Sequence, residues 1–148
     1  MTPEPYVLVS TWTVAAPPDR VWAVFDAFVD DADPFAWWPD LVVDRRDGDV
    51  LHVATRSGLG YRLRFRLHSL RTRPATSIGF DASGDLNGTG DVELAPDEQG
   101  GTHVRITWTV APARRWMRWT TPVLRPLYAA AHRRVMRRGE RALSAWLA

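Results

Sequence analysis

The sequence predicts an α+β fold in which an antiparallel sheet of about seven strands packs against one long C-terminal helix. Short alternating segments separated by turn signals fill residues 41–111. Apolar residues then recur at helical spacing to the end of the chain, and no second long helix is predicted between these parts. Because a sheet buries one face against another layer, the strands must pack largely on the terminal helix.

The N-terminal part predicts a strand followed by two short helices. Residues 6–14 are rich in β-branched residues, which favours a strand. Pro18 suits the first turn of a helix, where its missing N–H would have no partner in any case. A second short helix or helical turn is predicted over residues 30–38, before Pro39. The first helix has one apolar face, made by Val21, Trp22, Phe25 and Phe28.

The middle of the chain predicts consecutive antiparallel strands, because short turns join them. The predicted strands cover residues 41–46, 50–56, 60–71, 75–81, 86–95 and 102–111. The hairpin signals between them are Asp47-Gly48-Asp49, Gly58-Leu59-Gly60 and Gln99-Gly100-Gly101.

The terminal helix is indicated by apolar residues three, four or seven positions apart. These are Leu124, Tyr128, Ala131, Val135, Ala142 and Trp146. Gly139 interrupts this helix and costs about 1 kcal/mol relative to alanine, so it predicts either a close approach to the sheet or a bend.

Length and composition predict a single domain over residues 1–148. No apolar run approaches the roughly 20 residues of a membrane span, and the N-terminus lacks a signal-peptide pattern. We therefore expect a cytoplasmic protein without stable membrane insertion. The chain has no cysteine, its four histidines are dispersed, and it lacks a phosphate-binding loop and a nucleophile elbow. No metal and no cofactor are expected.

The charged residues include 19 arginines and no lysine, with a net charge of +2. Arg62, Arg64 and Arg66 alternate with apolar residues, which is typical of a strand with one solvated face. Since acidic residues nearly balance the arginines, no nucleic-acid partner is expected. A basic amphipathic helix can nevertheless bind a macromolecule or an anionic membrane. The terminal helix carries Arg133, Arg134, Arg137, Arg138 and Arg141.

Several sequence features together resemble the START-like (SRPBCC) superfamily, and within it the polyketide cyclase/dehydrase and lipid-transport proteins. They are Val14, the Ala15-to-Trp22 run, Trp37-Trp38-Pro39, Gly88-Thr89-Gly90, Gly101-Thr102-His103-Val104 and the closing helix. The resemblance covers nearly the whole chain, and its motifs are mainly structural. It implies a helix-grip fold, in which a curved sheet wraps the C-terminal helix and leaves an elongated apolar cavity between them.

Such a cavity is the usual place for a small apolar ligand with few polar contacts. The candidate wall residues are Trp12, Tyr61, Leu63, Phe65, Trp108, Tyr128 and Met136. Each of them has a plainer interpretation as a core residue, because apolar residues at strand or helix spacing more often fill a core than line a ligand site. Two polar candidates are His132, on the same side of the helix as Tyr128, and Asn87 beside Gly88. Gly88 and Gly90 could instead mark a bulge that curves the sheet.

The Trp37-Trp38 pair has two interpretations. The two indoles could cover the mouth of the cavity, or they could close the end of the short helix that precedes Pro39. The sequence does not decide between these alternatives.

Three functions are compatible with these features. The first is binding or transport of a small hydrophobic ligand, such as a lipid, a polyketide or a quinone-like compound. The second is an aromatase-type polyketide cyclase/dehydrase, with His132 and Tyr128 as candidate catalytic acid/base groups, so the sequence leaves enzymatic activity undecided. The third is an interaction module of the cochaperone or ribosome-associated type. A monomer or a homodimer is expected.

Overall fold

The computed structural model describes residues 6–56, 62–112 and 121–148. It contains one seven-stranded antiparallel sheet, with the strand order β1-β7-β6-β5-β4-β3-β2. The strands are β1 (Tyr6–Val14), β2 (Leu41–Asp47), β3 (Val50–Arg56), β4 (Arg62–Arg73), β5 (Ser77–Gly84), β6 (Leu86–Pro96) and β7 (Thr102–Pro112). The helices are α1 (Pro18–Asp26), the 3₁₀-helix η1 (Ala27–Val29) and α3 (Thr121–Trp146).

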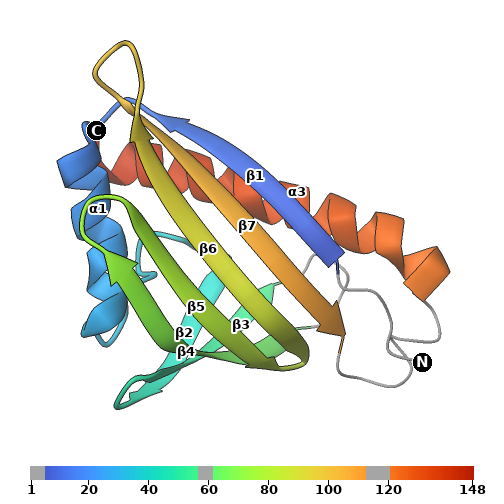
Figure 1. Cartoon of the computed structure of the whole chain (residues 1–148). Helices are drawn as coiled ribbons and strands as arrows, with labels where there is room; N and C mark the ends of the chain where they lie inside the picture. The colour runs from blue at the N-terminus through green and yellow to red at the C-terminus, as the bar shows by residue number, and fades with distance from the viewer. Residues whose placement is uncertain (1–5, 57–61, 113–120) are drawn as a thin grey trace.

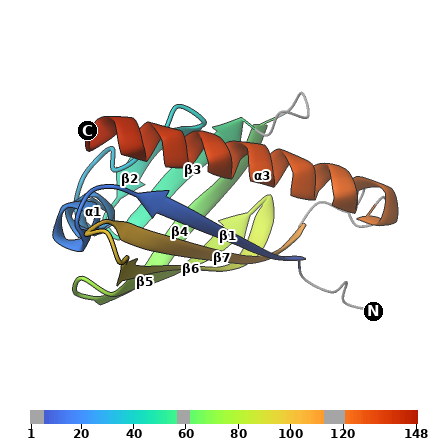
Figure 2. The same cartoon turned by 90° about the horizontal axis from the view of Figure 1, so that it is seen from above.

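The sheet curves around α3, which lies along its open side (Figures 1 and 2). β1 and β2 form the two edges of the sheet, so the helix faces the gap between the first and last strands in the order. This arrangement confirms the helix-grip fold and the predicted antiparallel sheet. The predicted Gly58-Leu59-Gly60 turn and Tyr61 lie outside the described residues.

The second short helix differs in position from the prediction. It is η1, which follows α1 directly, whereas residues 30–38 form hydrogen-bonded turns. The Trp38 N–H donates to the Phe35 carbonyl at 2.8 Å, which closes one of these turns. Pro34 explains why no helix continues here, because it lacks an N–H and disfavours the helical conformation of the residue before it. The helical-turn alternative is therefore the correct one.

An aromatic cluster joins β1 to the turn before β2. The ring of Trp12 lies 5.4 Å from that of Trp38, and Trp38 stacks on Trp37 at 5.3 Å, both measured between ring centroids. α3 touches this cluster at Gly139, where an added Cβ would lie 2.6 Å from Cε2 and Cζ2 of Trp38 and 2.9 Å from Cη2 of Trp12. Gly139 therefore marks a close approach of helix and sheet, one of the two predicted alternatives.

Polar groups on either side of Gly139 tie α3 to both sheet edges. Asp40 lies just before β2, and its Oδ2 is 2.9 Å from the Arg138 Nε. The two groups form an ion pair, but their orientation does not meet the geometry of a hydrogen bond. The Glu140 carboxylate accepts the N–H of Thr13 in β1 at 2.8 Å. Asp40 is buried, so Arg138 compensates a charge that would otherwise be costly in the interior. Three consecutive residues thus fix the helix across the open side of the sheet.

We expect the substitution Gly139→Ala to lower the free energy of unfolding by about 1–3 kcal/mol, because the new methyl group overpacks two buried indoles. This loss should outweigh the helix-propensity gain of about 1 kcal/mol. Urea unfolding of the variant and the native protein measures the effect. Ala130→Gly, at an exposed position of α3, measures the propensity contribution alone. An unchanged or increased stability of Gly139→Ala would show that α3 does not depend on this contact.

Candidate ligand cavity

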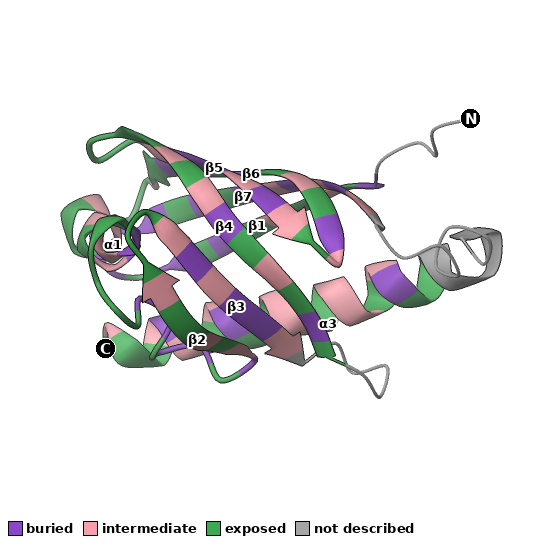
Figure 3. Ribbon diagram, turned by 90° about the horizontal axis from the view of Figure 1, so that it is seen from below, coloured by how far each residue is buried: buried purple, intermediate pink, exposed green. Residues whose placement is uncertain are grey.

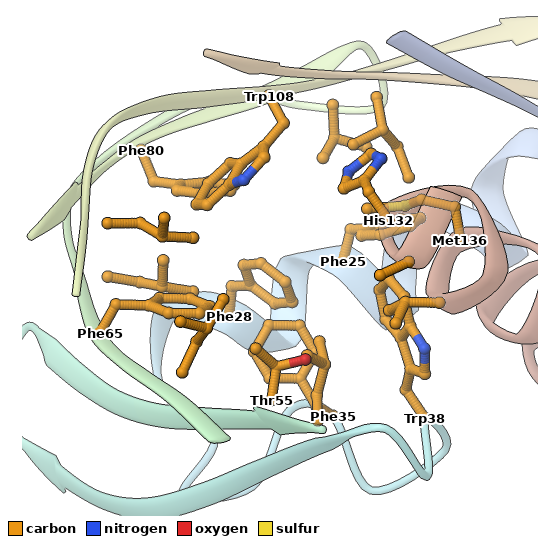
Figure 4. Close-up of a pocket in the computed structure, with 18 of the residues that line it drawn as sticks. Phe25, Phe28, Phe35, Trp38, Thr55, Phe65, Phe80, Trp108, His132 and Met136 are labelled. Atoms are coloured by element: carbon orange, nitrogen blue, oxygen red, sulfur yellow. The ribbon is translucent and has the colours of Figure 1, made fainter. Parts of the chain in front are cut away.

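An apolar cavity of about 130 Å³ lies between the inner face of the sheet, the region of α1 and η1, and α3 (Figure 4). From the sheet, the aromatic rings of Phe65, Phe80 and Trp108 face it, and the remaining strand positions contribute mainly Leu, Ile and Val. From the first helices and the following turns come Phe25, Phe28, Phe35 and Trp38. From α3 come Tyr128, Ala131, His132, Val135 and Met136.

The strand alternation explains how the sheet contributes to the wall. Along β4, exposed and more buried residues alternate from Arg62 to Leu67 (Figure 3). Leu63 and Phe65 line the cavity, while Arg64 and Arg66 are exposed, as the pattern predicted. One side of the strand therefore supplies the apolar wall and the other supplies the solvated face.

Two glycines of β6 permit close packing around this wall. A Cβ at Gly90 would lie 2.3 Å from the Phe80 ring, so the missing side chain makes room for a cavity-lining aromatic. A Cβ at Gly88 would lie 1.8 Å from the Thr109 carbonyl oxygen, so this position allows β6 and β7 to approach. The predicted bulge at these glycines is wrong, because β6 pairs in regular register with both neighbours and the register shifts lie in β2 and β4.

Six of the residues predicted from the sequence to contact a ligand line the cavity. They are Leu63, Phe65, Trp108, Tyr128, His132 and Met136. Trp12 is buried in the aromatic cluster with Trp37 and Trp38 and is not among the lining residues. Asn87 is exposed, and its side-chain oxygen accepts the Gly84 N–H at 3.2 Å in the turn between β5 and β6. Tyr61 lies outside the described residues.

Several aromatic residues of the cavity were not predicted from the sequence. The sequence placed Phe25 and Phe28 on one apolar helix face. It did not show that they line the same cavity as the terminal helix, because the two helices are far apart in the sequence. Phe80 alternates with Ile78 and Ala82, which is a signal for an inward position on β5. Trp38, for which the sequence left two interpretations, lies on the wall of the cavity.

Few polar groups face the cavity. The Trp108 Nε1 donates to the Tyr128 hydroxyl at 3.4 Å, so these two lining residues partly satisfy each other. Figure 4 shows the His132 ring projecting from α3 into the space opposite Phe65 and Phe80. Its Nε2 atom is buried and has no hydrogen-bond partner in the described part of the chain. His132 is therefore a lining residue with an unpaired hydrogen-bonding atom.

The electrostatic environment keeps His132 uncharged. Burial lowers the pKa of the imidazole from 6.5 to about 4, because the charged form loses its hydration, and the positive charge of Arg133 acts in the same direction. At neutral pH the ring is consequently the neutral imidazole. No Asp, Glu, Lys or Arg is found among the described lining residues, so the wall carries no formal charge near pH 7.

The other histidines lie away from the cavity. His52 pairs with Asp47 at 3.0 Å, and His68 contacts the hydroxyls of Ser69 and Ser83 at 3.1 and 3.3 Å. Within residues 6–56, 62–112 and 121–148, no three His, Asp or Glu side chains come together in a way that could hold a metal ion. Over the same residues, no helix has the length and apolar character needed to span a membrane.

The family of the chain follows from comparison with known proteins. A family profile described as "Polyketide cyclase / dehydrase and lipid transport" matches residues 7–145. The chain therefore belongs to this family, which confirms the resemblance to the START-like superfamily. A comparison with curated protein sequences finds no significant match.

Solved structures show the same fold at low sequence identity. TTHA0849 from Thermus thermophilus is 17% identical, with a TM-score of 0.71 over 97% of this chain and 100% of that chain. A START superfamily protein from Mycobacterium smegmatis is 13% identical, with a TM-score of 0.70 over 95% and 96%. The Zhui aromatase/cyclase from Streptomyces sp. R1128 is 15% identical, with a TM-score of 0.63 over 92% and 93%. At these identities the likeness establishes the fold alone.

We expect His132 to make the protein less stable as the pH falls from 7 to 5. In this interval the unfolded chain protonates its imidazole, whereas the folded protein, with a pKa of about 4, does not. Protons therefore favour unfolding, and this contribution levels off below pH 4. The native protein should lose about 2 kcal/mol more than the His132→Leu variant between these two pH values. Urea unfolding at both pH values measures the difference, and an equal pH dependence in the two proteins would contradict the assigned burial.

Proposed function

We propose that this protein binds a small hydrophobic molecule in the cavity between the sheet and α3, and that it carries this molecule in a water-excluded form. The observation that supports this function is the cavity itself. Its wall is almost entirely aromatic and aliphatic, and it carries no formal charge at neutral pH. Clefts of this composition, with a small number of polar groups, are typical ligand sites.

The size of the cavity favours a compact ligand. Its volume of about 130 Å³ is close to that of an engineered apolar cavity of about 150 Å³ that holds one benzene ring in another protein. Aromatic side chains on several sides also suit a flat ring, because rings pack favourably edge to face or offset. Among lipid, polyketide and quinone-like ligands, these features favour a ring compound over a long acyl chain.

A second candidate function is polyketide cyclisation or dehydration, and the observation that favours it is the unpaired Nε2 of His132, a residue that lines the cavity. An imidazole at this position could accept or donate a proton during an aldol condensation. Its low pKa makes it a weak base at neutral pH, so binding without turnover is the better-supported function. Assays of a poly-β-ketone substrate with His132→Ala and Tyr128→Ala test the alternative, and turnover equal to that of the native protein in both variants would reject it.

Native mass spectrometry of the freshly purified protein tests the proposed function even while the identity of the ligand is unknown. We expect a mass above that of the bare chain, and solvent extraction should release a compound that can be identified. An empty protein that also fails to bind toluene and other small aromatic compounds would contradict the proposal.

Filling the cavity should weaken binding. Ala131 lines the cavity and Ala130 is exposed on the same helix, so the two positions form a matched pair. We expect Ala131→Leu to weaken toluene binding roughly tenfold or more, because its side chain occupies the space of the ligand. Ala130→Leu should bind toluene within about twofold of the native protein, since leucine and alanine are both good helix formers. Isothermal titration calorimetry measures both affinities, and equal effects of the two substitutions would place the ligand elsewhere.

A further inference from the structure

We propose that the ligand is a neutral molecule with one hydroxyl or carbonyl group, and that this group forms a hydrogen bond with the Nε2 atom of His132. The inference rests on the proposed function, since it describes the ligand of the same cavity. Its starting point is the buried Nε2 of a residue that lines the apolar cavity, an atom that has no partner in the described part of the chain.

An unpaired buried polar atom is expensive. Burial of a hydrogen-bonding group without a partner is unfavourable, because the group loses water and gains nothing in exchange, and most such groups in native proteins are therefore paired. A wholly apolar ligand would leave His132 unsatisfied, whereas a ligand with a hydroxyl or carbonyl group would satisfy it. The geometry thus favours a ligand that carries a hydrogen-bonding group at the α3 side of the cavity.

Other polar atoms near the cavity are less available to a ligand. Tyr128 already accepts the Trp108 N–H. The Trp38 Nε1 is also unpaired, but the atom bonded to it, Cε2, lies 2.6 Å from the position of a Cβ at Gly139, so this edge of the indole faces α3. The unpaired Trp12 Nε1 belongs to a residue that does not line the cavity. The hydroxyl of Thr55, another lining residue (Figure 4), is not a buried unpaired group. Among these polar groups, His132 is therefore the best-placed partner.

The absence of charge on the described wall argues for a neutral ligand. A carboxylate in the cavity would lose its hydration without gaining a cation, which is strongly unfavourable. His132 does not supply a positive charge at neutral pH, because its pKa lies near 4. The neighbouring Arg133 is exposed and is not a lining residue. Fatty acids and other organic anions should consequently be rejected.

A phenol is the most useful probe, because its hydroxyl can donate to or accept from Nε2 and so suits either tautomer of the imidazole. The matched set is toluene, p-cresol and p-toluate. All three compounds contain a methylated ring. Toluene carries no polar group, p-cresol carries a neutral hydroxyl and p-toluate carries a carboxylate. Calorimetric titration at pH 7 of the native protein, His132→Leu and His132→Gln measures the contribution of the side chain. His103→Leu, at an exposed residue of β7, is the control for the same type of substitution.

We expect the native protein to bind p-cresol roughly tenfold more tightly than toluene, and p-toluate at least about a hundredfold more weakly than p-cresol. The preference for p-cresol should disappear in His132→Leu, return in part in His132→Gln and persist in His103→Leu. Circular dichroism of each variant verifies that it is folded before titration, and His132→Gln provides a second test if the leucine variant does not fold.

The possible failures are distinguishable. If toluene and p-cresol bind the native protein equally, or if His132→Leu keeps the preference, the inference about His132 is wrong while the binding function stands. If p-toluate binds as tightly as p-cresol, the ligand need not be neutral, and that part of the inference is overturned. If none of the three compounds binds, the proposed function fails and the inference fails with it.

Discussion

The attachment of α3 to both edges of the curved sheet is the constraint on which the rest of this structure depends. Arg138 pairs with the buried Asp40 before β2, Glu140 accepts an N–H from β1, and Gly139 between them lets the helix touch two indoles. A strongly curved sheet with two free edges has no other long helix within the described residues to cover its inner face. Together with the fully buried Leu143 and the ring contact of Tyr128 with Tyr6 at 5.3 Å between centroids, these contacts set the separation of helix and sheet and the shape of the space between them.

The cavity follows from this attachment. The three residues that hold α3 lie toward its C-terminal part, and the lining residues from Tyr128 to Met136 lie on the preceding turns. There the helix faces large aromatic side chains of the sheet and of α1, which leave a space that the side chains do not fill. A bulky wall held at a fixed distance encloses a ligand without the cost of a large rearrangement on binding. Among the few polar groups of this mainly apolar wall, His132 has the buried unpaired nitrogen, so it can determine both the orientation and the chemical class of the ligand.

Local patterns predicted most of the fold, because strand alternation and helical spacing depend on neighbours in the sequence. They identified Leu63 and Phe65 on one strand face, and Tyr128, His132 and Met136 on one side of the helix. The sequence could not predict which tryptophan lines the cavity and which is buried in the core. Trp12 and Trp38 are equally apolar, and only the docking of α3 decides which one lines the cavity. The pairing of Asp40 with Arg138 was likewise hidden, because it joins residues far apart in the chain.

The central claim is that the space between the sheet and α3 is the ligand site, and intermolecular nuclear Overhauser effects test it most directly. With toluene as the ligand and isotope-labelled protein, we expect contacts from the toluene methyl protons to the ring protons of Phe80 and Trp108 and to the methyl group of Ala131. A saturated complex that shows contacts only to exposed residues on the outer face of the sheet would contradict this claim.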